Sequence, residues 1–124
     1  MKKKIVSIIL ISFSLLSFYS FKHGEETPHG GVVKHATHGY NIEKVRGIGR
    51  MYFYLLEHDE ISTVRDSKIS GRIEIKFTNE ETLLLNLTLK GDSETLKTLY
   101  KDKRKIQNID VYIKYQGKEI YARF

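Results

Sequence analysis

The sequence predicts an all-β protein: a small antiparallel β-sandwich or partly open barrel of about seven strands with one short helix. Apolar and polar residues alternate with a period of two along most of the chain, as in half-buried strands. A chain of 124 residues also has the size at which one hydrophobic core is the rule. We expect a signal peptide over 1–20, a flexible leader over 21–30 and a single β domain over 31–124.

The first twenty residues have the pattern of a secretory signal. Lys2, Lys3 and Lys4 are followed by an uncharged apolar stretch, 5–16, which is too short to span a bilayer comfortably. The pair of small residues that usually marks the cleavage site is missing, so an uncleaved membrane anchor stays open as an alternative. The sequence therefore predicts a periplasmic or secreted protein.

Composition narrows the classes of function. The chain has no cysteine, which excludes a disulfide framework and a lipid anchor attached to a cysteine. Three of the 21 basic residues are the signal lysines, so the rest of the chain has 18 basic and 15 acidic residues. The resulting charge of +3 does not point to a nucleic-acid partner. Nucleophile-elbow, zinc-protease and phosphate-loop motifs are missing from the sequence, so we expect no enzyme.

The first strands are expected on both sides of a short turn. Residues 31–35 and 40–46 form the first predicted pair, joined at 36–39. Residues 50–56 are apolar on both faces, which predicts a central strand that is covered on both sides. A loop is expected from about 58 to 70.

The second half of the chain repeats the strand pattern. In 72–77, three apolar residues face one way and three charged residues face the other, and the leucines of 83–89 follow the same period. The last two predicted strands are 111–115 and 119–124. They meet at 116–117, where a glycine supplies the positive φ of a tight hairpin.

One segment departs from this period and predicts the short helix. Leu96, Leu99 and Tyr100 recur at spacings of three and four, which places them on one face of a helix. Asp92 precedes them and belongs to the residue types that cap helix N-termini. We expect this helix to close the domain.

Histidines gather directly after the signal segment. Four of the five lie within sixteen residues: His23, His29, His35 and His38. Imidazole is a common ligand of zinc and copper, and neighbouring donors share the entropy of holding one ion. The cluster therefore predicts a copper or zinc site, with solvated histidines as the alternative.

Chain geometry limits which histidines can act together. At about 3.3 Å per residue, His29 and His35 lie roughly 20 Å apart along an extended strand and cannot share an ion. His35 and His38 flank a turn that can bring them to one side. His29 begins the first strand and can lie opposite Glu43 on the second. The candidate metal ligands are therefore His29, His35, His38 and Glu43.

Three further features have two interpretations each. Met51 is either a thioether ligand suited to Cu(I) or a core residue. The mixed imidazole and carboxylate segment 57–60 is expected to be a solvated turn rather than a site. The basic run 101–105 is expected to be a solvated connection, with a phosphate-binding patch as the alternative.

Three stretches carry a resemblance to a known group of proteins: PHGGVV at 28–33, GYNIEKV at 39–45 and MYFYLL at 51–56. They resemble small periplasmic β-domains that open with Pro-His-Gly-Gly and continue with an aromatic-x-hydrophobic-Glu strand and a tyrosine-rich strand. In bacteria of the Bacteroidetes type, such domains are associated with heavy-metal efflux adaptors and copper-handling proteins. The resemblance implies a ligand role for His29 and Glu43.

Together these features predict an exported domain that binds or delivers copper or zinc through its N-terminal histidines. The expected partners are a metal ion and an efflux adaptor or other envelope protein, with membrane contact only through an uncleaved signal segment. The alternative is a structural or protein-interaction β-sandwich of the cell envelope without a metal. A nucleic-acid-binding barrel is the third hypothesis.

Overall fold

The computed structural model describes residues 27–124, which form eight β-strands and one short 3-10 turn. The strands are β1 (Val32–His35), β2 (Asn41–Gly47), β3 (Arg50–Leu56), β4 (Ser70–Phe77), β5 (Thr82–Leu89), β6 (Leu96–Leu99), β7 (Ile106–Tyr115) and β8 (Lys118–Arg123), and the 3-10 turn is η1 (Thr37–Gly39). The predicted signal peptide and the first part of the predicted leader, 21–26, lie outside the described residues. In the described part, no helix has the length and apolar character needed to cross a membrane.

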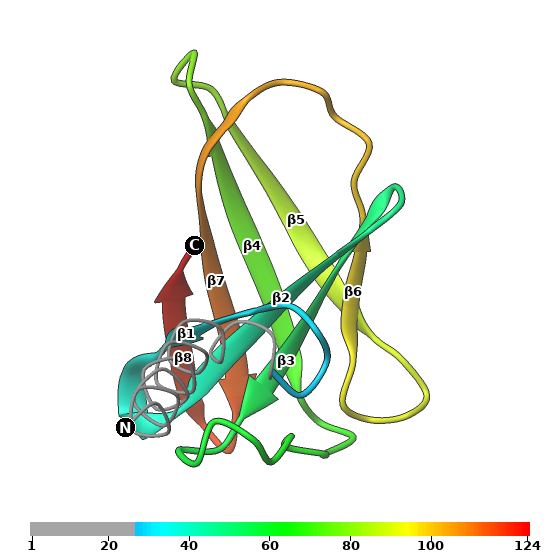
Figure 1. Cartoon of the computed structure of the whole chain (residues 1–124), viewed down its shortest axis with the longest axis vertical. Coiled ribbons are helices and arrows are strands. Elements are labelled where there is room, and N and C mark those ends of the chain that lie inside the picture. The colour runs from blue at the N-terminus through cyan, green and yellow to red at the C-terminus, as the bar shows by residue number, and fades with distance from the viewer. Residues whose placement is uncertain (1–26) are drawn as a thin grey trace, which may run out of the picture.

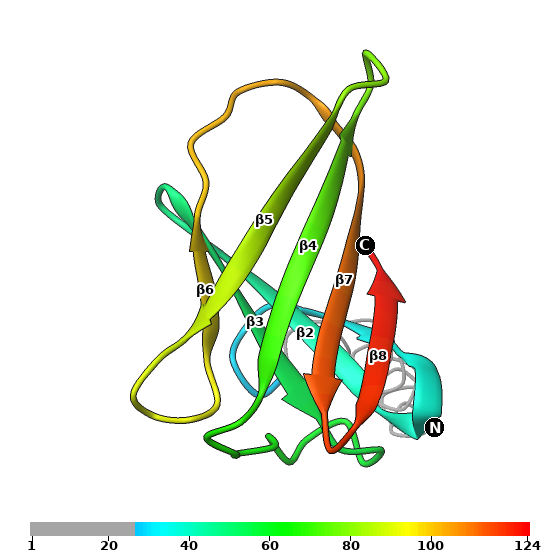
Figure 2. The same cartoon turned by 180° about the vertical axis from the view of Figure 1, so that it is seen from behind.

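The strands form one antiparallel sheet that curls into a nearly closed barrel. Their order is β1-β2-β3-β6-β5-β4-β7-β8, and Figure 2 shows β6, β5, β4, β7 and β8 side by side with the β2–β3 hairpin crossing behind them. The edge strands β1 and β8 contact each other. Between η1 and β8, the Tyr121 backbone N–H donates a 2.9 Å hydrogen bond to Thr37 Oγ1. A side chain therefore helps to close the barrel where no backbone ladder does.

Apolar residues at alternating strand positions fill the barrel. Those with essentially no solvent exposure are Ile42, Met51, Phe53, Leu55, Ile73, Ile75, Phe77, Leu96, Val111, Ile113 and Ile120. Burying each such side chain stabilises the fold by about 1.5–3 kcal/mol. Met51 belongs to this core, which favours the packing interpretation over a thioether ligand.

The outer face of β3 is covered only in part. Tyr52 and Tyr54 alternate with the core residues of this strand and are half-buried. The ring of His29 covers Tyr54, and the Lys90 ammonium lies 5.9 Å from the centroid of Tyr52. Chain segments from outside the strand therefore provide the cover that its two-sided apolar pattern predicts.

The predicted helix at 92–100 is wrong, because this segment contains strand β6, which pairs with β3. Leu96 and Tyr100 are buried, whereas Leu99 is 61% exposed, so the real period is two. The Asp92 carboxylate does accept a backbone hydrogen bond three residues ahead, from Thr95 at 2.9 Å. That contact caps a tight turn here, and the chain continues as a strand.

The all-β prediction is confirmed, with eight strands in place of about seven. Of the two predicted architectures, the structure has the barrel, and it is partly open because the edge strands β1 and β8 do not form a backbone ladder with each other. The predicted hairpin between the last strands is present. Gln116 and Gly117 both adopt positive φ, 52° and 76°, as a two-residue hairpin turn requires.

Candidate functional site

His29 and Glu43, which the sequence pairs across the first two strands, are in contact on the outside of the barrel. The segment before β1 lies over the β2–β3 hairpin (Figure 1), and the Glu43 side chain is completely buried there. The carboxylate accepts the backbone N–H groups of His29, at 3.0 Å, and Gly31, at 2.8 Å. It also contacts His29 Nδ1 at 2.8 Å. Glu43 therefore holds both the backbone and the ring of this segment.

Two glycines allow this segment to approach β2. Gly30 adopts a φ of +78°, which favours glycine. A Cβ added to Gly31 would lie 2.1 Å from the Lys44 carbonyl oxygen and 2.7 Å from Val45 Cγ2. The His-Gly-Gly sequence thus supplies the ring that contacts Glu43, then a residue in the left-handed region, and then a residue small enough for the backbone to lie against β2.

The His29 ring has a defined orientation. It stacks on the Tyr54 ring with a centroid distance of 3.6 Å and an interplanar angle of 3°. Because a carboxylate oxygen accepts hydrogen bonds, Nδ1 donates to Glu43, and the neutral ring keeps its lone pair on Nε2. Nε2 lies 4.0 Å from Glu94 Oε2. The ring therefore lies between two carboxylates.

Glu94 is positioned by the turn between β5 and β6. The Asp92 carboxylate accepts the backbone N–H of Glu94 at 3.0 Å and the Thr95 hydroxyl at 2.6 Å. The hydroxyl contact, aided by the backbone contacts, lowers the pKa of Asp92 to about 2. Arg65 donates to Glu94 Oε1 at 3.0 Å, so the other oxygen is the one that faces His29.

The other predicted ligands do not join this site. His35 Nδ1 lies 2.8 Å from Asn41 Oδ1 and 3.9 Å from Glu60 Oε2, and the His35 side chain is 85% exposed. His38 lies in η1 with a φ of +60° and is exposed. Among residues 27–124, no group of three or more His, Cys, Asp or Glu side chains has an arrangement that could hold a metal ion. The four predicted ligands therefore do not form one cluster.

The pair of His29 Nε2 and Glu94 Oε2 can still act as two donors. Zinc bonds of about 2.0–2.2 Å at a tetrahedral angle place two donor atoms roughly 3.4 Å apart. A small movement of the partly exposed Glu94 side chain would bring its 4.0 Å separation from Nε2 into this range. A carboxylate on the opposite ring nitrogen, as Glu43 provides, is the usual support of a metal-binding histidine. Nitrogen and oxygen donors suit zinc or Cu(II).

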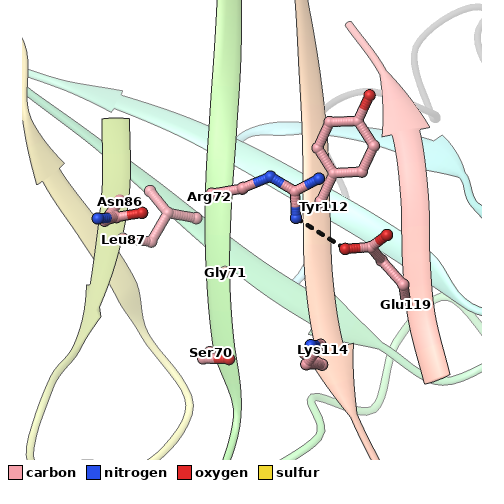
Figure 3. A pocket seen from close by; sticks show the side chains of 8 residues that line it. All are labelled: Ser70, Gly71, Arg72, Asn86, Leu87, Tyr112, Lys114 and Glu119. Carbon is pink, nitrogen blue, oxygen red and sulfur yellow. Dashed lines mark hydrogen bonds and ion pairs between the residues drawn. The ribbon is translucent and has the colours of Figure 1, made fainter. Parts of the chain in front are cut away.

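A separate hollow of about 290 Å³ lies on the outer face of β4, β5, β7 and β8, and Figure 3 shows the side chains that line it. The Arg72 guanidinium donates to Glu119 at 2.7 Å and lies 4.2 Å from the centroid of Tyr112. This hydrogen bond raises the pKa of Arg72 and lowers the pKa of Glu119. The charged groups satisfy each other across three strands, so we assign this cluster a role in holding the sheet together.

Sequence reasoning missed Glu94. This residue reaches His29 through the pairing of β3 with β6, which joins segments far apart in the chain. No local spacing signals such a contact. The one available signal was Asp92, a turn-forming residue type two positions before Glu94, and the helical interpretation took it for a helix cap.

No protein-family model matches the chain, and searches of curated proteins and of solved structures find no match either. The resemblance to periplasmic metal-associated β-domains therefore stays a prediction. The function has to be argued from the residues of the site.

Proposed function

We propose that this chain is an exported barrel domain that binds one zinc or Cu(II) ion at His29 and Glu94 and delivers it to an envelope partner. The observation that supports the proposal is the His29 ring between two carboxylates. Its Nδ1 contacts Glu43 at 2.8 Å, and its Nε2 faces Glu94 at 4.0 Å.

In this proposal Glu43 orients the histidine instead of binding the ion. Its oxygens already accept hydrogen bonds from His29 and Gly31. A carboxylate that accepts the Nδ1 proton fixes the ring tautomer and makes Nε2 a stronger ligand. Stacking on Tyr54 fixes the plane of the ring as well.

An incomplete set of ligands favours delivery over permanent storage. Two protein donors leave two positions of a tetrahedral ion for water or for ligands from a partner, whereas structural zinc sites use four protein ligands. The side chains of His29 and Glu94 are 22% and 19% exposed, so an ion between them is accessible from solvent. Such a site exchanges its ion readily.

Calorimetric titration of the purified exported protein with Zn(II) and Cu(II) tests the proposal. We expect one ion per chain with a micromolar dissociation constant. His29→Gln and Glu94→Gln should each weaken binding by about tenfold or more, because each removes one of two donors. Binding should also weaken in acid, since imidazole ligates as the neutral ring.

The matched control is the double variant His35→Gln with His38→Gln, which removes two exposed histidines and should leave the affinity unchanged. Absence of micromolar binding to either ion would refute the proposal. Equal affinity in the native protein and in His29→Gln would refute the assigned site.

A structural or protein-interaction domain of the envelope is the second candidate function. The observation that favours it is that Glu43 is satisfied entirely by contacts within the chain. On this hypothesis the contact with His29 serves the fold alone. The melting temperature would then be the same with and without zinc, whereas ion binding to the native state raises it.

A further inference from the structure

A cavity of about 540 Å³ lies at one end of the barrel, between the tip of the β2–β3 hairpin and the connection from β6 to β7. Figure 1 shows both segments at this end of the molecule. Four basic side chains line the cavity: Arg46, Arg50, Lys101 and Lys103. We call this region, with its apolar rim of Ile48 and Leu99, the basic end.

The positive charges of the basic end are not neutralised within the described part of the chain. No carboxylate in residues 27–124 lies within 4.0 Å of the four cationic groups that line the cavity. Asp102 also lines the cavity, but its two carboxylate oxygens share the Nε–H group of Arg104 in a bifurcated hydrogen bond, at 2.9 and 3.1 Å. That partner lowers the pKa of Asp102 to about 2. The four cations therefore remain available to an external anion.

A buried hydroxyl in the cavity wall also lacks a partner. Tyr100 is 5% exposed, and its hydroxyl has no hydrogen-bond partner among the described residues. The Arg46 guanidinium lies 5.6 Å from the centroid of the same ring. Because this hydroxyl has no accessible surface, the polar groups that the cavity offers to an anion are the four cationic side chains.

Apolar side chains stand beside these cations. Ile48, at the tip of the hairpin, is 100% exposed, and Leu99 is 61% exposed. Positive charges around a protruding apolar residue match the interface of an anionic bilayer, where headgroups attract cations and the acyl boundary accepts apolar side chains.

We infer that the basic end docks on an anionic phospholipid bilayer, with a headgroup phosphate in the cavity and Ile48 in the interface. A soluble phosphate ester would satisfy the cations but leave the protruding isoleucine in water. The basic run 101–105 thus divides: Lys101 and Lys103 line the cavity, whereas Arg104 binds Asp102 and Glu81. If residues 1–20 remain as an uncleaved anchor, this surface adds a second membrane contact.

Sedimentation with lipid vesicles tests the inference, using protein expressed from the full chain and purified in its exported form. Vesicles of phosphatidylcholine with one third phosphatidylglycerol are compared with pure phosphatidylcholine. We expect binding to the anionic vesicles that falls steeply with added salt. The double variant Arg50→Gln with Lys101→Gln should weaken this binding about tenfold or more, and Ile48→Ser should weaken it as well.

The charge-matched control, Lys114→Gln with Lys118→Gln at the β7–β8 hairpin, should change vesicle binding less than twofold. Equal losses in the two double variants would overturn the assigned surface, and equal binding to both vesicle types would overturn the preference for anionic lipid. Inorganic phosphate at millimolar concentration separates the two sources of phosphate. If inorganic phosphate binds the protein in a calorimetric titration while the protein does not sediment with the anionic vesicles, the cavity is a site for soluble phosphate and the inference fails.

Discussion

Gly31 supports the candidate site in two ways. Its backbone N–H donates to the buried Glu43 carboxylate at 2.8 Å, and its missing side chain lets the segment lie against β2. Any larger residue places a Cβ 2.1 Å from the Lys44 carbonyl oxygen. The position of His29, two residues earlier, therefore depends on a glycine that carries no functional group.

Replacing Gly31 with alanine should destabilise the protein by about 2 kcal/mol or more, because the segment has to move away from β2. Urea unfolding followed by circular dichroism measures the change. Gly91→Ala is the matched control: a Cβ there meets nothing within 4 Å, so its stability should stay within about 0.5 kcal/mol of the native value. Equal unfolding midpoints for the two variants would contradict the close contact.

At the scale of single elements, the strands were predictable where burial is one-sided and the alternation long. β4, β5, β7 and β8 follow from their period of two, and Gly117 marks the last hairpin. β6 was not predictable, because it has only four residues and the exposed Leu99 imitates a helical spacing. Asp92 added to the error, since the same carboxylate contacts cap helices and tight turns.

The Asp92 turn gives a prediction about acid stability. Hydrogen bonds, chiefly from the Thr95 hydroxyl, lower the folded-state pKa of Asp92 from 3.8 to about 2. A depressed carboxyl pKa stabilises the fold above the unfolded pKa, and this contribution is lost as the pH falls through the folded value. The stability advantage of the native protein over Asp92→Asn should therefore shrink between about pH 4 and pH 2.

Urea midpoints at several pH values measure this advantage. Asparagine keeps a side-chain oxygen for the backbone N–H groups of Glu94 and Thr95 but does not titrate in this range. The other carboxylates titrate in both proteins, so the difference isolates Asp92. A difference that stays constant from pH 5 to pH 2 would contradict the assigned turn contacts.

At the scale of the whole molecule, the sequence predicted half of the candidate site. The contact of His29 with Glu43 follows from β1 and β2, which are neighbours in the chain. Glu94 comes close to His29 because the sheet order β3-β6-β5 brings segments together that are distant in the chain. The basic end arises in the same way, from a hairpin tip and a later connection. Local patterns specify strands and their faces, but not which strands become neighbours.

The most direct test of the proposed metal site is an NMR spectrum that correlates the imidazole nitrogens of the histidines with their ring protons, recorded with and without zinc. Without metal, at a pH where imidazole is neutral, His29 should carry its proton on Nδ1. Zinc should then shift the Nε2 signal of His29 and leave those of His35 and His38 in place. A proton on Nε2 of the metal-free ring, or an unchanged His29 signal at saturating zinc, would contradict the proposed site.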